Sequence, residues 1–151
     1  MKFKLDWDKP VPMKLTRDGD FQIDLNCVPA SPGIYIFARK WGKSYEALYV
    51  GRSKNLSSRI KNHLNSVRLT KHLRNARSGR RVLIYGIPET KQGQQQYKVL
   101  ASLEKAFIRH FLLEGHDIFN SQGTRMRNHE IDSVGKIPKA FIPSTIYLER
   151  N

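Results

Sequence analysis

Cysteine is almost missing from this 151-residue chain: Cys27 stands alone, so the chain can form no internal disulfide and no cysteine-based zinc site. The N-terminal stretch MKFKLDWDKP lacks the apolar segment of a secretory signal, and no uninterrupted apolar run reaches about 18 residues. These absences favour a cytoplasmic protein that does not enter a membrane. Because 39% of the residues are apolar, one core can be buried, which predicts a single domain over residues 1–151.

Acidic residues are also scarce: 13 Asp and Glu face 27 Lys and Arg, which gives a net charge of +14. Residues 1–24 carry equal numbers of acidic and basic side chains, whereas residues 47–88 contain no acidic residue. The basic residues of this block are Arg52, Lys54, Arg59, Lys61, Arg68, Lys71, Arg74, Arg77, Arg80 and Arg81. A solvated face normally mixes both signs, so we interpret the block as a phosphate-binding surface. Membrane headgroups would attract the same charge, but the block lacks an amphipathic helix with a large aromatic face, so nucleic acid is favoured.

Short apolar runs and helical periodicity predict a small sheet with helices packed against it, in an α/β or α+β arrangement. The predicted strands are 21–28, 33–38, 47–51, 81–88 and a candidate last strand at 144–149. Strands 33–38 and 47–51 read as a hairpin with a long loop, and the continuous apolar run of 81–88 is typical of a central strand. The predicted helices run from a cap at Ser53 or Asn55 to Val67, over 69–77, and over 97–113.

Glu104 is out of place on the helix predicted over 97–113. Its neighbours three and four positions away are Leu100, Ala101, Phe107 and Ile108, so it borders the apolar stripe and has no basic partner on its helix. Ionised carboxylates are seldom buried unless they are paired or bind a metal ion. A structural ion pair with one of the arginines and a functional role are equally compatible with this pattern.

Tyr35, Tyr49 and the pair Arg59 and His63 are further candidates that each have an ordinary explanation. The two tyrosines lie on adjacent predicted strands, where a half-buried ring with its hydroxyl at the rim is common. His63 lies one helical turn after Arg59, so both side chains share one helix face, which is usually a solvated surface. None of these residues indicates a reaction site by itself.

Taken together, these residues resemble the GIY-YIG nuclease family. The matching positions, in the family's order, are GIY at 33–35, YVG at 49–51, Arg59, His63, Glu104 and Asn120. The resemblance covers 31–122, leaves 1–30 and 123–151 as extensions packed on that core, and implies a central antiparallel three-stranded sheet flanked by helices. YVG has Val in place of Ile, and the 13 residues that join the motifs are slightly more than is usual.

The resemblance also implies a metal-dependent DNA endonuclease, with a role for each residue. Glu104 would hold one Mg²⁺ or Mn²⁺ ion, because a hard cation that keeps several waters suits a single carboxylate. Arg59 would bind the non-bridging phosphate oxygens. Tyr35 would be the general base or orient water, with its pKa lowered by nearby cations, while Tyr49 positions water or phosphate. His63 would share the proton transfer or orient Tyr35.

Asn120 would brace the site by hydrogen bonding, and basic residues around the motifs would contact the nucleic acid. These basic candidates are Arg52, Lys54, Lys61, Arg68, Lys71, Arg74, Arg125 and Arg127. The loop 121–130 contains side chains able to read base edges, but it suits phosphate contacts equally well. DNA is the expected partner, with RNA as the alternative.

Other interpretations stay open at this level. The charge alone also fits a non-catalytic nucleic-acid-binding or ribosome-associated protein with the same fold. A metal site made of histidines has weak support, because the five histidines show no H-x-x-x-H spacing. A homodimer would favour a restriction role with two cuts, whereas a monomer would favour nicking, repair or a toxin-like activity.

Overall fold

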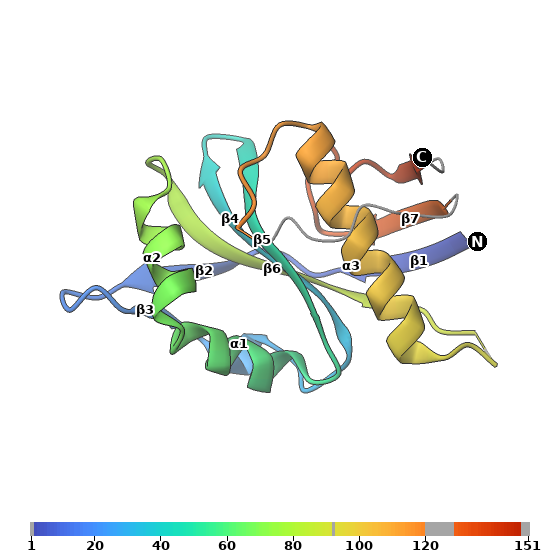
Figure 1. Ribbon diagram of the computed structural model, residues 1–151, viewed down its shortest axis with the longest axis horizontal. Coiled ribbons are helices and arrows are strands. Elements are labelled where there is room, and N and C mark those ends of the chain that lie inside the picture. The colour runs from blue at the N-terminus through green and yellow to red at the C-terminus, as the bar shows by residue number, and fades with distance from the viewer. Residues whose placement is uncertain (1, 92, 120–128, 149–151) are drawn as a thin grey trace.

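A computed structural model describes residues 2–91, 93–119 and 129–148 (Figure 1). Within these residues there are eight strands and three α-helices. The strands are β1 (Lys2–Trp7), β2 (Val11–Leu15), β3 (Phe21–Ile23), β4 (Gly33–Trp41), β5 (Ser44–Ser53), β6 (Arg80–Pro88), β7 (His129–Gly135) and β8 (Thr145–Leu148). The helices are α1 (Leu56–Leu64), α2 (Val67–Asn75) and α3 (Gln96–Leu113), and a 3-10 helix, Leu25–Cys27, follows β3.

Strand β6 lies at the centre of one mixed sheet, as its continuous apolar run predicts. It pairs in antiparallel with β4 along one edge and with β1 and β2 along the other, and β4 pairs onward with β5. Beyond β1 the sheet continues with β7, which is parallel to β1, and then with antiparallel β8. The prediction of a three-stranded antiparallel sheet is therefore wrong: β4, β5 and β6 match it, but the described residues form an eight-stranded mixed sheet.

The additional strands come from both ends of the chain. In β1, buried Phe3, Leu5 and Trp7 alternate with exposed polar residues, and this period of two is the signature of a half-buried strand. The sequence-based prediction did not use that signal. It also extended the strand at 21–28 too far, because Asp24 accepts a hydrogen bond from the Asn26 N–H and starts the 3-10 helix.

Strands β4 and β5 form one long hairpin, and the long loop expected between them is wrong. They extend to Trp41 and Ser44, which leaves a turn of Gly42 and Lys43. Gly42 has a φ of 57°, a left-handed conformation that glycine adopts readily. The polar segment continues as strand because Arg39 is buried and its Nε donates to Glu46 Oε1 across the hairpin at 2.8 Å.

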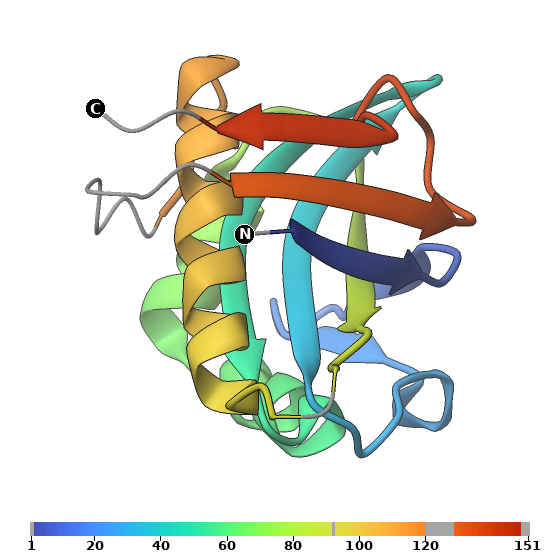
Figure 2. The ribbon, with the colours of Figure 1, turned by 90° about the vertical axis from the view of Figure 1, so that its right-hand side faces the viewer.

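The helices cover both faces of this part of the sheet, with α1 and α2 on one face and α3 on the other (Figures 1 and 2). Alternation along β4 directs Ile34 and Ile36 toward the cluster that contains α3, and Tyr35 and Phe37 toward the cluster of α1 and α2. All three predicted helices are present, and the Asn55 side chain caps α1. None of the helices in the described part of the chain is long and apolar enough to cross a membrane.

Candidate active site

Tyr35 and His63 form the centre of the candidate site. Strand β4 buries Tyr35 to 1% exposure, and α1 holds His63 over the same face of the sheet. Tyr35 Oη lies 2.5 Å from His63 Nε2, so a short hydrogen bond joins the strand to the helix. The structure thus brings together two residues that are 28 positions apart in the sequence.

Burial determines which member of this pair carries the proton. It raises the pKa of Tyr35 well above the usual value, and Tyr49 adds to this rise while Arg59 opposes it. Burial and the charge of Arg59 lower the pKa of His63 to about 4. At neutral pH both partners are therefore uncharged, and the Tyr35 hydroxyl donates to Nε2 in the imidazole tautomer whose proton is on Nδ1. The expectation that nearby cations lower the pKa of Tyr35 is wrong for the free protein, because burial outweighs Arg59.

Tyr49 and Arg59 complete the cluster around this hydrogen bond. The Tyr49 ring stacks on Tyr35 with centroids 6.1 Å apart, and it lies 5.0 Å from the His63 ring. Arg59 interacts most strongly with Tyr35 and less strongly with Tyr49. Both interactions raise the pKa of the Arg59 guanidinium. Because Arg59 is exposed, a phosphate arriving from solvent can reach it. All four predicted residues thus lie in one cluster.

The glycine of the second motif provides the space for this phenol. Gly51 lies opposite Tyr35 in the hairpin register, and a Cβ there would collide with the ring and hydroxyl of Tyr35. Val50 points to the opposite face and is fully buried in the cluster that contains α3. Because Val50 lies on the face opposite Tyr35, the departure from YIG changes none of the residues that line the site.

Glu104 approaches from α3, beside the strand β5. Its side chain is 23% exposed and accepts a hydrogen bond from Arg52 Nη1 at 3.1 Å. Burial raises the pKa of Glu104, and Arg52 and Arg59 oppose that rise. Of the two explanations left open by the sequence, the structure contains the ion pair. The influence of Arg59 also places this carboxylate near the phenol cluster, so an ion pair and a functional role are compatible.

Glu104 is the one carboxylate beside the cluster that could hold a hard cation, among the residues that the structure describes. Among the described residues there is no group of three or more His, Cys, Asp or Glu placed to bind a metal ion. Mg²⁺ commonly keeps several waters and binds through only one or two carboxylates, which matches a lone, half-buried glutamate. Arg52 is the side chain that such a cation would displace.

Six predicted nucleic-acid contacts are exposed between β5 and the end of α2: Arg52, Lys54, Lys61, Arg68, Lys71 and Arg74. Arg74 also donates to the Gly19 carbonyl oxygen at 3.4 Å. Arg81 belongs to the same basic block but donates to backbone carbonyls of Leu73, Ala76 and Gly79, so its guanidinium is engaged within the fold. Three predicted residues, Asn120, Arg125 and Arg127, lie outside the described residues.

Phe119 is a neighbour of the site that the sequence argument missed. Its ring centroid lies 6.3 Å from that of Tyr49 and 5.2 Å from that of His72. Its backbone N–H donates to the Leu48 carbonyl oxygen at 2.8 Å, which fixes it beside β5. The sequence signal that could have identified Phe119 is its position directly before Asn120, which is one of the motif positions.

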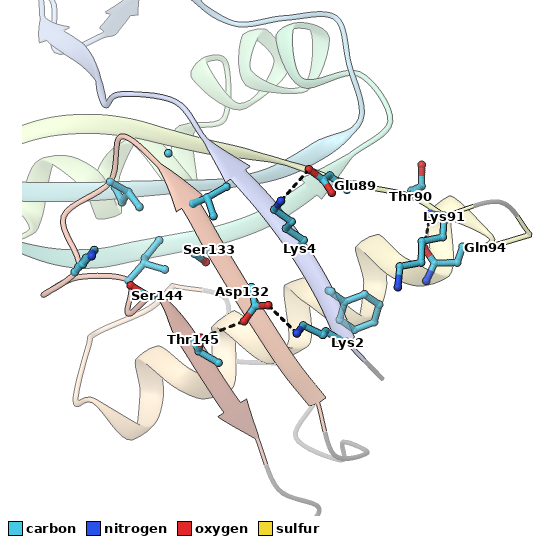
Figure 3. A pocket seen from close by; sticks show the side chains of 16 residues that line it. Lys2, Lys4, Glu89, Thr90, Lys91, Gln94, Asp132, Ser133, Ser144 and Thr145 are labelled. Carbon is cyan, nitrogen blue, oxygen red and sulfur yellow. Dashed lines mark hydrogen bonds and ion pairs between the residues drawn. The ribbon is translucent and has the colours of Figure 1, made fainter.

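A hollow of about 780 Å³ lies elsewhere, on the part of the sheet formed by β1, β7 and β8 (Figure 3). Two of its lysines are already paired, Lys2 with Asp132 at 3.2 Å and Lys4 with Glu89 at 3.5 Å. None of the candidate site residues that the structure describes lines this hollow. The site is therefore recognised by its chemistry and not by the size of a cavity.

Comparison with known protein families matches the region that holds this site. A family model described as the GIY-YIG catalytic domain matches residues 31–115, which is more than half of the chain. No curated protein and no solved structure matches the chain significantly. The matched residues include the whole Tyr35, Tyr49, Arg59 and His63 cluster and Glu104.

Proposed function

Because this chain belongs to the GIY-YIG family, we propose that it is a DNA endonuclease that hydrolyses phosphodiester bonds with the help of one divalent cation. The buried hydrogen bond between Tyr35 and His63 is the observation that supports this proposal most strongly. A phenol and an imidazole with strongly displaced pKa values beside an exposed arginine are typical of reaction sites.

Tyr35 and His63 provide a path for the proton of the attacking water. The water gives a proton to Tyr35 Oη while the phenol proton moves to His63 Nε2, so the phenol need not ionise first. A bound phosphodiester brings negative charge to the pair, which raises the pKa of His63 and favours the imidazolium. In this scheme Tyr35 orients the water and relays its proton, and His63 accepts it.

Arg59 would bind the phosphate next to this relay. Its planar guanidinium suits two non-bridging oxygens, and it stabilises the charge that develops on them in the transition state. Its present interactions with Tyr35 and Tyr49 show that it reaches both phenols from α1. Tyr49 would then hold the phosphate or the water in line, and Asn120 would brace the arrangement by hydrogen bonding.

Glu104 would hold one Mg²⁺ or Mn²⁺ ion, and Arg52 would change partners. When bound, the cation neutralises charge on the phosphate and assists the leaving oxygen. In the free protein, Arg52 pairs with the half-buried carboxylate and favours its ionised form. Once Glu104 binds the cation, the exposed Arg52 can turn to the phosphate, and the half-buried carboxylate still has a partner.

The exposed basic residues of β5, α1 and α2 would position the nucleic acid around the cluster. Each Lys or Arg that neutralises a phosphate releases counterions, which supplies affinity without sequence preference. Arg68 and Lys71 lie three positions apart on α2 and so project from the same side of that helix. RNA carries the same phosphates, and a comparison of both polymers in the assay below separates the two substrates.

A second candidate is a nucleic-acid-binding protein without catalysis, and the Arg52–Glu104 ion pair favours it. If that pair persists when nucleic acid and divalent cations are present, Glu104 is purely structural. The basic face would then bind phosphate, and the cluster of Tyr35 and His63 would have no cation beside it.

Replacement of Glu104 by Gln separates these candidates on supercoiled plasmid in Mg²⁺. We expect the wild type to cleave, and E104Q to cleave more slowly by at least about 100-fold while it still binds DNA. Glu114→Gln changes an exposed acid just after the same helix and serves as the matched control. Binding without cleavage by the wild type would favour the non-catalytic protein, whereas cleavage by E104Q at the wild-type rate would refute the role of Glu104.

A further inference from the structure

Phe119 presents an aromatic ring to solvent at the border of the proposed reaction site. The side chain is 39% exposed, although its backbone is tied to β5 by the hydrogen bond to Leu48. The neighbouring Ile118 is 6% exposed and fills the core instead. The ring of Phe119 is thus fixed in place but not needed to complete the core.

The surroundings of this ring are aromatic and basic. Tyr49 and His72 flank it, with interplanar angles of 32° and 44°, and the guanidinium carbon of Arg68 lies 5.8 Å from its centre. The Nε2 atom of His72 is buried and has no hydrogen-bond partner among the described residues.

This ring lies directly beside a member of the proposed reaction cluster, Tyr49. The centroid of the Tyr49 ring lies 6.3 Å from that of Phe119 and 6.1 Å from that of Tyr35, on which Tyr49 stacks. A nucleotide whose phosphate is bound by Arg68 therefore has its base within reach of Phe119. Aromatic side chains beside basic residues are the usual platform for unstacked bases, because every base has a π-face.

We propose that Phe119 stacks one unpaired nucleobase next to the scissile phosphate, with Arg68 binding the phosphate of that nucleotide. This proposal rests on the proposed function, because that function identifies DNA as the ligand. A paired base inside a duplex has both faces covered by its neighbours and cannot use the ring. The protein should therefore prefer DNA that contains an unpaired nucleotide over fully paired DNA.

Binding measurements in EDTA test this preference without requiring cleavage. The probes are two duplexes of the same length, one with a single bulged 2-aminopurine and one with that base paired. We expect the wild type to bind the bulged duplex roughly tenfold more tightly, and the 2-aminopurine fluorescence to be quenched by stacking. Phe119→Trp should keep both effects, because it retains a ring.

Two substitutions and one control show whether the ring is responsible. Phe119→Ala and Phe119→Leu should both lose the preference and the quenching, and Leu keeps an apolar side chain in case Ala impairs folding. Tyr147→Ala removes a 72% exposed aromatic from β8 and should retain the preference. Equal binding of both duplexes by the wild type, or a preference that survives in F119L, overturns the inference.

The result of the duplex-binding experiment can be separated from the result of the plasmid-cleavage experiment. If the wild type shows the preference but never cleaves plasmid, the proposed endonuclease fails while the base-stacking subsite stands. If it cleaves plasmid but binds both duplexes equally, the endonuclease stands and the subsite is refuted.

Discussion

Tyr35 and His63 share one short hydrogen bond, and it exists only when β4 and α1 are packed together. Burial keeps the phenol protonated and the imidazole neutral, so the resting pair is uncharged. An uncharged pair can be buried at a lower cost than an ionised one. The proposed chemistry therefore begins when a phosphodiester supplies the charge that makes proton transfer to His63 favourable.

The lowered pKa of His63 predicts how stability depends on pH. Between about 6.5 in the unfolded chain and about 4 in the folded protein, the unfolded chain binds a proton that the folded protein does not. Stability is therefore fully present above about pH 6.5 and falls as the pH drops toward 4. His63→Gln retains an acceptor for the Tyr35 hydroxyl but cannot titrate, so we expect its unfolding temperature to fall less over this range.

Two other histidines also contribute to the pH dependence of stability. Burial also lowers the pKa values of His110 and His116, and both residues titrate in the wild type and in the variant. Only the difference between the two thermal-unfolding profiles reports on His63. Parallel profiles between pH 7 and pH 4 would contradict a buried, neutral imidazole.

Single residues were easier to locate in the sequence than their electrostatics were to predict. The motif positions 35, 49, 59 and 63 lie together in the structure as the resemblance implied. The pKa of Tyr35 could not be predicted because it depends on burial by elements that are distant in the sequence. The partner of Glu104 was missed for a related reason: Arg52 lies 52 residues earlier, beyond the reach of helical spacing.

The β4–β5 hairpin is the element that carries most of the site. It contributes Tyr35, Tyr49, Gly51 and Arg52, and its register sets the contact between Tyr35 and Gly51. Near its tip, Arg39 is 7% exposed and depends on Glu46 for its charge partner. The hairpin is thus held by an ion pair near the turn and by aromatic packing near the site.

Removal of the charge partner of Arg39 should destabilise this hairpin. Glu46→Gln leaves a buried guanidinium without a carboxylate, and we expect the free energy of unfolding to fall by about 2 kcal/mol, less than for a fully buried pair. Urea denaturation measures this change. Glu89→Gln breaks the exposed pair with Lys4 and should change stability little. If both variants lose the same stability, the Arg39–Glu46 pair does not anchor the hairpin.

Elements with strong periodicity could be predicted, and those that depend on long-range pairing could not. The apolar stripe of α3 and the continuous run of β6 were sufficient to locate both. The hairpin strands were predicted too short because Arg39 and Glu46 look like loop residues until they are seen to pair. The strands β1, β2 and β7 join the sheet through partners far away in the chain, although the alternation in β1 was already visible.

At the scale of the whole molecule, the sheet separates two kinds of surface. The β5 edge, with α1 and α2, carries the phenol cluster and the exposed basic residues, whereas the lysines of β1 are balanced by acids of β7 and by Glu89 (Figures 1 and 3). The exposed Lys and Arg of the acid-free block 47–88, which supply a large part of the net charge of +14, are therefore concentrated where the proposed substrate would lie. Substitutions of the exposed basic residues on that side are expected to change DNA affinity, and substitutions in the phenol cluster are expected to change the rate of cleavage.

The most direct test is the rate of plasmid nicking by Tyr35→Phe in Mg²⁺, measured together with DNA affinity. The substitution removes one hydroxyl and keeps the ring that packs on Tyr49 and Phe37. We predict that nicking slows by at least about 100-fold, because the proton relay is lost, while DNA affinity stays within a factor of about two. Nicking by Y35F at the wild-type rate would contradict the account.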